Sequence, residues 1–339
     1  MDSVTTALDC RAGARAVLAA EEQAAERLGA RLVTRLEAGY PARLAELALP
    51  PPVLAIAGSF TFDCEAKDSE ALEPYTPQTP QTPCVAIVGS RLATPYGIEV
   101  AAWLARELAQ QGVVVVSGFA KGIDAAAHQG ALAADCGRTL GVLGCGLSFD
   151  YPKGHRELGR RIRGRGALLS EFPCAYPPLP GNFPVRNRII AALAGITVVV
   201  EAAARSGSLI TARLALDLGR EVLAVPGRIT DEQALGVNDL LRDGAAPLTH
   251  PADILERLGR NASSRQAPGS AAAGRLPPEL PAPQAALFAV LDPGRDLAAE
   301  TLAGEAEIGI DVAMAALLEL ELAGWAVRGV AGGYRRGSP

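Results

Sequence analysis

The central part of the chain alternates between short apolar runs and longer segments with apolar residues at helical spacing. Strands that are apolar throughout and alternate with helices are typical of a parallel sheet covered by helices on both faces. The pattern therefore predicts an α/β domain over residues 84–258, with an extended Rossmann-like, doubly wound, mostly parallel sheet. The predicted strands are 84–88, 113–116, 138–143, 167–170, 196–200 and 221–225, and the predicted helices are 98–111, 124–134, 155–163, 187–194 and 209–218.

The regions that flank this domain have different patterns. Residues 15–38 show helical periodicity and residues 53–58 a strand entered through prolines, so residues 1–58 are expected to form a partial N-terminal helical region. Residues 59–83 are acidic and then rich in Pro, Thr and Gln, which is typical of a flexible, extended surface insertion. Gly, Ser, Ala and Pro dominate residues 259–283, which predicts a linker.

The C-terminal segment, residues 284–339, predicts a small domain of its own. Apolar residues at helical spacing indicate three helices, at 284–291, 297–305 and 311–322. Two short runs between 324 and 336, separated by glycines, indicate a β-hairpin. Three helices followed by a hairpin predict a winged helix.

The net charge differs between the regions of the chain. The formal net charge is −5, which by itself argues against a nucleic-acid-binding protein. Residues 84–258, however, hold 18 basic and 16 acidic residues, whereas the segments before and after them are acidic. The total charge therefore does not exclude nucleic-acid binding by the central domain.

Other compositional signals favour a cytoplasmic protein without metal or membrane. The first ten residues contain acidic side chains and no apolar signal segment. The longest apolar run, 191–200, is about half of a membrane span. The six cysteines form no C-x-x-C pair, and with three histidines they give no zinc-binding spacing. Scattered single cysteines are typical of a reducing compartment, and a disulfide is not expected.

Glycine, serine and basic residues recur where the predicted parallel strands end. Since these ends lie at one edge of the sheet, the loops after them should line a common site. Glycines allow close approach of a phosphate, and helix N-termini offer free N–H donors, so the pattern predicts a phosphate-binding rim. Neither G-x-G-x-x-G nor G-x-x-x-x-G-K-[ST] occurs, which argues against a nicotinamide cofactor or a Walker-type ATPase, and no cofactor is expected.

Signals for catalysis are weak. His128 lies among alanines in a predicted helix, where a packed histidine is favoured over a general base. Glu171 and Glu201 follow strands and are expected to pin adjacent loops, and Asp124 to cap its helix or to neutralise an arginine. The arginine run at 156–165 fits a solvated helix face or, less well, a nucleic-acid track.

Several segments of the central domain follow one another in a distinctive order. They are VAIVGSR (85–91), SGFAKGIDAAAH (117–128), GVLGCGL (141–147), SEFP (170–173), NFPVRNRIIA (182–191), SGSLIT (206–211) and GREVLAVPG (219–227). Together they resemble the DNA-processing protein A (DprA/Smf) family over about residues 40–258. The tail LLELELAGW, which begins at residue 317, with Tyr334 and Arg335, resembles the winged helix that some family members carry.

The resemblance implies a DNA-binding protein and not an enzyme. Such proteins protect incoming single-stranded DNA during natural transformation, load RecA onto it, and form homodimers through the Rossmann-like domain. By resemblance, Arg91 and Lys153 would contact phosphates, Phe183 would stack on a base, and Arg186 and Arg188 would line or brace the groove. The full set implied to bind DNA is Gly89, Ser90, Arg91, Ser117, Gly118, Lys121, Lys153, Phe183, Arg186, Asn187, Arg188, Ser206, Gly207, Ser208 and Thr211.

The chain departs from the family pattern in three places, of which the insertion at residues 59–83 is one. The family commonly has a lysine shortly before the position of Phe183, whereas residues 179–182 here are Leu-Pro-Gly-Asn, so one phosphate contact is in doubt. The N-terminal domain, which in the family has helix-hairpin-helix or SAM-like character, is shortened here.

Two other functions remain open from the sequence. A nucleotide phosphoribohydrolase on a related scaffold would carry Pro-Gly-Gly-x-Gly-Thr-x-x-Glu, but Ser206–Thr211 has no glutamate on the following turn. A double-strand-binding regulator would use the winged helix. Its third helix contains Asp311, Glu319 and Glu321 and no Lys or Arg, which favours contact with protein over DNA.

Overall fold

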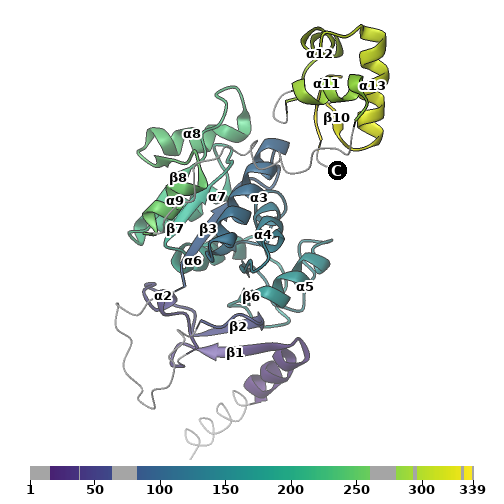
Figure 1. Cartoon of the computed structure of the whole chain (residues 1–339). Helices are drawn as coiled ribbons and strands as arrows, with labels where there is room; N and C mark the ends of the chain where they lie inside the picture. Colours follow the sequence, from purple (N-terminus) through teal and green to yellow (C-terminus); the bar gives the residue numbers. More distant parts are fainter. Residues whose placement is uncertain are drawn as a thin grey trace, which may run out of the picture. The chain divides into compact units, whose positions relative to one another are not determined.

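The computed structural model describes residues 16–37, 39–62, 82–259, 280–292, 296–329 and 332–337. These residues form two compact units, which are divided within the segment 260–279 (Figure 1). Most of the predicted insertion at 59–83 and of the predicted linker at 259–283 lies outside the described residues. None of the helices in the described ranges combines the length and the apolar character that crossing a bilayer requires.

The larger unit is built on a mixed sheet with the strand order β1-β2-β6-β5-β4-β3-β7-β8-β9. From β6 to β9 all neighbours are parallel, which confirms the predicted mostly parallel α/β fold. Chain order reverses between β3 and β7, so loops on the two sides of this point diverge and leave room for a ligand. The parallel strands are β3 (Cys84–Val88), β4 (Val114–Ser117), β5 (Thr139–Val142), β6 (Ala167–Ser170), β7 (Ile196–Val199), β8 (Glu221–Ala224) and β9 (Ala246–Pro247).

Helices cover both faces of this sheet. Alternate strand residues pack into two separate buried clusters, since successive side chains on a strand point to opposite faces. One face carries α3 (Pro95–Gln110), α4 (Ile123–Ala133), α5 (Arg156–Arg165) and α9 (Pro251–Arg257). The other carries α2 (Ala42–Ala45), α6 (Asn182–Leu193), α7 (Gly207–Asp217) and α8 (Leu235–Arg242), which follows a 3₁₀ turn at Glu232–Ala234.

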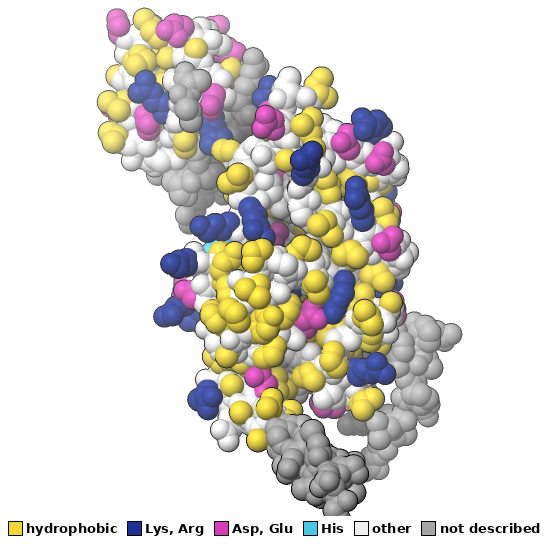
Figure 2. Space-filling view, turned by 180° about the vertical axis from the view of Figure 1, so that it is seen from behind, with side chains coloured by type: hydrophobic (Ala, Val, Ile, Leu, Met, Phe, Trp, Pro, Cys, Tyr) yellow, Lys and Arg dark blue, Asp and Glu magenta, His cyan; other side chains and the backbone are white. Residues whose placement is uncertain are grey.

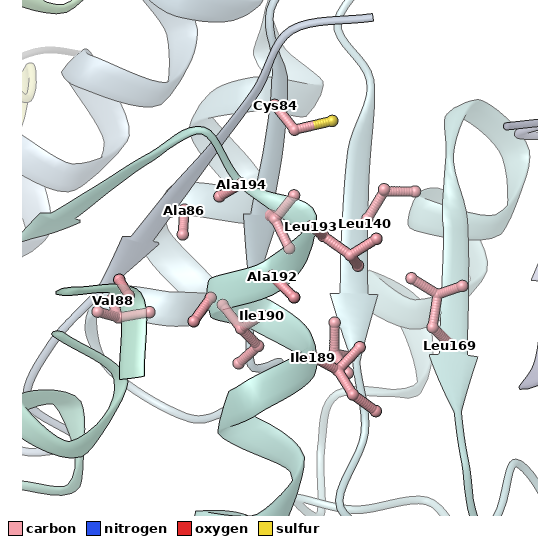
Figure 3. Packing of buried hydrophobic residues seen from close by; sticks show 14 of the residues in the cluster. Cys84, Ala86, Val88, Leu140, Leu169, Ile189, Ile190, Ala192, Leu193 and Ala194 are labelled. Atoms are coloured by element: carbon pink, nitrogen blue, oxygen red, sulfur yellow. The ribbon is translucent and has the colours of Figure 1, made fainter. Parts of the chain in front are cut away.

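The apolar face of α6 forms a large part of the core on the second face. Ile189, Ile190 and Leu193 are fully or almost fully buried. They pack over the strands with Leu140 from β5 and Leu169 from β6 (Figure 3). Because the first turn of α6 lies beyond the carboxyl ends of the strands, this packing fixes the position of the polar residues that begin the helix.

The N-terminal region differs from its prediction. A helix covers residues 16–27, but residues 30–34, which were expected to continue it, form strand β1 (Ala30–Thr34). The helix ends because Gly29 adopts a φ of +63°, a conformation that favours glycine and terminates helices. The predicted strand at 53–58 is confirmed as β2 (Val53–Gly58), which pairs antiparallel with both β1 and β6. Both strands are therefore part of the large sheet.

The smaller unit has the predicted winged-helix elements. It contains α11 (Ala282–Val290), α12 (Ala299–Glu305) and α13 (Ile310–Leu322), followed by a hairpin of β10 (Ala326–Arg328) and β11 (Tyr334–Arg336). Leu287, Leu302 and Leu317, one from each helix, are fully buried together with Tyr334 of the hairpin. The unit therefore has a core of its own.

Candidate functional site

A cleft of about 600 Å³ lies beyond the carboxyl ends of β3 and β7, where the strand order reverses. Its walls come from the loop after β3, the start of α6, and the loop that leads into α7. The cleft brings together ten of the residues that the sequence analysis selected. They are Gly89, Ser90, Arg91, Phe183, Arg186, Asn187, Ser206, Gly207, Ser208 and Thr211.

One wall of the cleft is an aromatic ring beside a guanidinium group. The guanidinium carbon of Arg91 lies 5.3 Å from the centroid of the Phe183 ring, within cation–π range. The Tyr151 ring lies 5.3 Å from the same ring at an interplanar angle of 31°. Phe183 can occupy this place because residue 144 is glycine, where a Cβ atom would lie 2.7 Å from Cδ1 of Phe183. This wall offers a flat apolar surface next to a positive charge.

The opposite wall is the N-terminus of α7. Ser206 is its N-cap, and the Ser206 side chain accepts a hydrogen bond from the Ser208 N–H. Asn187 Nδ2 donates to the carbonyl of Gly207 at 3.2 Å, which ties α6 to the start of α7. The exposed Arg205 directly precedes the cap. A helix N-terminus with a nearby arginine favours the binding of an anion such as a phosphate.

Arg186 lies at the floor of the cleft and is almost completely buried. Its guanidinium donates to the carbonyl oxygens of Gly118, at 2.6 Å, and of Val142. Burial lowers the pKa of Arg186 to about 10, and the nearby Asp124 opposes that shift. Arg186 therefore ties the loop after β4 to the end of β5.

Asp124 is the buried acidic neighbour of Arg186. Its carboxylate accepts a hydrogen bond from the Ala120 N–H at 3.2 Å, and Gly122 stands at the N-cap position of α4. Burial raises the pKa of Asp124, whereas the charge of Arg186 acts in the opposite direction. Of the two roles expected for Asp124, the structure supports neutralisation of an arginine.

Other polar residues hold the loops around the cleft. Glu201 accepts hydrogen bonds from the backbone N–H and the hydroxyl of Thr94, the N-cap of α3. Glu171 pairs with Arg188 at 2.5 Å. Both carboxylates thus fix loops, as expected. The Ser90 hydroxyl donates to Gln233 Oε1 at 2.6 Å, which joins the loop after β3 to the 3₁₀ turn.

Five of the selected residues do not line the cleft. The Ser117 side chain is fully buried and donates to the carbonyl of Ile87 at 2.6 Å. Gly118 lies beneath the floor against Asp124 and Arg186. Arg188 is engaged with Glu171, and Lys121 and Lys153 are exposed near the mouth of the cleft.

Besides Asp124, which was expected to cap a helix or to neutralise an arginine, the cleft contains three polar or aromatic residues outside the selected set. They are Tyr151, Arg205 and Gln233. Signals for the first two were present, because Tyr151 precedes Pro152 in the loop after β5 and Arg205 directly precedes Ser206. The sequence contains no sign that Gln233 belongs to the site, because it lies 143 residues after its partner Ser90.

No histidine lines the cleft, and the described residues hold no metal centre. His128 is fully buried in α4, where its Nδ1 lies 2.7 Å from Thr139 Oγ1, so it is a packed histidine as expected. Across the described ranges, no group of three or more His, Cys, Asp or Glu side chains lies together as metal ligands would. The cleft can chemically hold phosphate groups and a flat ring.

The chain is similar to proteins of known sequence and structure. Protein Smf of Escherichia coli is 41% identical over 255 residues, which are 74% of this chain and 67% of Smf. The alignments with several other curated relatives span about half of their length.

Two solved structures of similar proteins share the fold of this chain. The X-ray structure of DNA processing protein A from Streptococcus pneumoniae superposes with a TM-score of 0.58 at 36% identity, covering 67% of this chain and 73% of that protein. DNA processing protein A from Helicobacter pylori, whose structure concerns its single-stranded DNA binding mode, gives a TM-score of 0.55 at 30% identity. It covers 68% of this chain and 95% of that protein.

Family descriptions match both units of the chain. The DprA winged helix domain matches residues 271–332, which include the three helices and the first hairpin strand of the smaller unit. The domain of DNA recombination-mediator protein A matches residues 76–259, which include the whole cleft. The chain therefore belongs to the DNA recombination-mediator protein A family, also called DprA or Smf.

Proposed function

We propose that this protein binds single-stranded DNA in the cleft, protects it, and loads RecA onto it during natural transformation and recombination. The observation that carries the proposal is the placement of Phe183 and Arg91 opposite the N-terminus of α7. Proteins that bind single strands combine aromatic surfaces for bases with positive charge for phosphates. The family and the single-stranded DNA binding named for the Helicobacter pylori relative support the same conclusion.

In this proposal the residues have distinct tasks. Phe183 stacks on a base, and Arg91 and Arg205 meet phosphates together with the free N–H groups of α7. Lys121 and Lys153 are exposed near the mouth and attract the strand. The buried Arg186 braces the floor, and the protein acts as a binding protein without catalysing a reaction.

The proposal includes a homodimer through the Rossmann-like domain in the cytoplasm. Val185 on α6 and Ile210 and Leu216 on α7 are exposed apolar side chains. Figure 2 shows hydrophobic side chains gathered over the centre of the face that is turned away in Figure 1. Among the described cysteines, Cys84, Cys145 and Cys174 are buried and free, in keeping with a reducing compartment.

The experiment that tests DNA binding is a salt titration of affinity for labelled single-stranded and double-stranded DNA. Binding should favour the single strand. Arg91→Ala should weaken it and reduce the salt slope by about 0.7 for each lost phosphate contact. Phe183→Ala should weaken it by about 1–3 kcal/mol, the contribution of one stacked base. Arg242→Ala, which changes an exposed arginine at the end of α8 that does not line the cleft, is the control.

Unchanged affinity in both cleft variants would refute this site. Release of a free base from a nucleoside monophosphate would instead favour the phosphoribohydrolase alternative. RecA loading is tested separately, by the rate of RecA filament growth on single-stranded DNA with the wild type and with Phe183→Ala.

A further inference from the structure

A second cleft, of about 340 Å³, opens beside α5 in the same unit. Its floor is apolar and includes Leu143, Leu147 and Leu168. Its rim carries the side chains of Arg156 and Arg160, which are 86% and 74% exposed. An apolar floor below a rim of positive charge is a pattern that suits a flat ring attached to a phosphate.

The second cleft shares its dividing wall with the first. In the loop after β4, Ala120 lines the first cleft and the adjacent Phe119 lines the second. In the loop after β5, Tyr151 lines the first cleft and the adjacent Asp150 the second. Because consecutive residues face the two clefts, a strand that leaves the first cleft across these loops arrives at the second.

Side chains in the second cleft offer a surface for a base. Phe149 lines the cleft and is 37% exposed, so part of its side chain is accessible to a ligand. His155 also lines it, and its Nδ1 atom is buried without a hydrogen-bond partner among the described residues. The Phe119 ring packs edge-on against His155, at 5.3 Å between centroids. The cleft thus presents an aromatic face beside an apolar floor.

The backbone at the dividing wall is held in an uncommon conformation. Phe119 has a φ of +57°, in the left-handed region that bulky residues seldom occupy. Its ring nevertheless is nearly fully buried, between His128 and His155. Such strain persists only where surrounding contacts enforce it, and it is commonly found at binding sites.

Four of the five arginines of α5 divide into two groups. Arg165 donates to the carbonyls of Leu132 and Ala134 at the end of α4, and Arg163 donates to the carbonyl of Leu28, so both serve the fold. Arg156 and Arg160 form only exposed ion pairs, with Asp150 and Glu157. Exposed pairs contribute about 0–1 kcal/mol, so they can open in favour of a phosphate.

The position of α5 agrees with a surface open to an anionic strand. In Figure 1, α5 lies at the right of the sheet, which becomes the left flank in Figure 2. Lys and Arg side chains gather on that flank of the larger unit. Two exposed lysines lie at the dividing wall. Lys121 directly follows Ala120, and Lys153 lies two residues after Tyr151.

We propose that the second cleft binds the continuation of the single strand held by the first. A base lies against Phe149 and the apolar floor, and the flanking phosphates meet Arg156 and Arg160. This inference rests on the proposed function of the first cleft and extends it to a second base-binding site. It also assigns the arginine run of α5, in part, to the nucleic-acid track.

The experiment compares oligothymidylates from about 4 to about 16 nucleotides, the range of site sizes known for single-strand-binding domains. Short oligonucleotides fill only the first cleft and long ones fill both. The variants are Phe149→Ala and the double change Arg156→Ala with Arg160→Ala. Arg242→Ala is a matched control, because Arg242 is 75% exposed and, like Arg160, pairs with an acidic residue three positions earlier.

Phe149→Ala should weaken binding of the long oligonucleotide about 5- to 150-fold, as expected for the loss of one stacked base, and leave the short one unchanged. The double arginine variant should lower the salt slope for the long oligonucleotide by about 1.4, that is about 0.7 for each phosphate. Photocrosslinking with 5-iododeoxyuridine at successive positions should place one position at Phe149.

Failure of this inference differs from failure of the proposed function. If wild type binds both oligonucleotides and the second-cleft variants bind the long one equally well, the inference is wrong and the first cleft stands. Equal losses for short and long oligonucleotides would also overturn it, because the changes would then act on the first cleft. If the wild type binds neither oligonucleotide, both proposals fail.

Discussion

His128 makes the stability of the larger unit depend on pH in a direction that the structure determines. Thr139 Oγ1 donates to the carbonyl of Val115 at 2.7 Å, so it accepts a hydrogen bond from His128 Nδ1–H. The other ring nitrogen, Nε2, is buried without a partner in the described part of the chain. Protonation would place a second N–H at that atom and a charge in an apolar interior, which is unfavourable.

Burial, together with the nearby His155 and Arg186, lowers the pKa of His128 from 6.5 to about 3. A histidine whose pKa is depressed in the folded state takes up its proton mainly on unfolding. Its stabilising contribution is therefore present above about pH 6.5 and is lost as the pH falls toward about 3. Integration of this difference gives a loss of about 2 kcal/mol between about pH 7 and about pH 5.

The perturbation that isolates this effect is His128→Asn. The Asn amide can still donate to Thr139 Oγ1 but does not titrate. Urea unfolding at the two pH values is followed by the fluorescence of Trp103, which lies on α3 in the larger unit. A Trp325→Phe background removes the tryptophan of the smaller unit from the signal.

The measured quantity is the difference between the two proteins in how much unfolding free energy each loses on acidification. His128→Asn lowers stability at neutral pH if the new side chain packs less well, but that cost is the same at both pH values. The wild type should lose about 2 kcal/mol more than the variant. Parallel losses in the two proteins would refute the reasoning.

Two further predictions concern the floor and the wall of the first cleft. Gly144→Ala places a Cβ atom 2.7 Å from Cδ1 of Phe183, so the ring should be displaced. Single-strand binding should weaken by up to about 1–3 kcal/mol while the circular dichroism spectrum stays unchanged. Unchanged affinity would contradict this prediction. Arg186→Met leaves the Asp124 carboxylate buried without its cation and should cost about 3–5 kcal/mol in urea unfolding. Adding Asp124→Leu should restore part of that stability, and strictly additive losses would contradict the coupling.

The strands of the parallel sheet could be predicted because each is a short apolar run that ends in a turn residue. Cys84–Val88 and Ile196–Val199 are examples. Strand β1 could not, because Ala30–Thr34 continues the spacing of the preceding helix, and only Gly29 marks the change. Its pairing with β2 provides a hydrogen-bonding partner that local periodicity does not reveal.

The location of the first cleft could likewise be predicted, because the carboxyl ends of parallel strands lie at one edge of the sheet. The separate roles of Arg186 and Arg188 could not. Two positions along a helix differ by about 200° in direction, so one side chain enters the floor and the other meets Glu171. Which of the two is buried depends on how α6 packs on the sheet, and the sequence alone does not show this.

The pairing of β2 with β6 has a consequence for any shortened form of the protein. All four residues of β6 are buried, and β2 and β1 lie outside it in the sheet (Figure 1). A chain that began at Cys84, just before the first segment that resembles the family, would leave β6 as an apolar edge strand with unpaired backbone groups. Such edges promote strand addition between molecules, so the shortened chain should aggregate, whereas one that retains residues 16–58 keeps the edge covered.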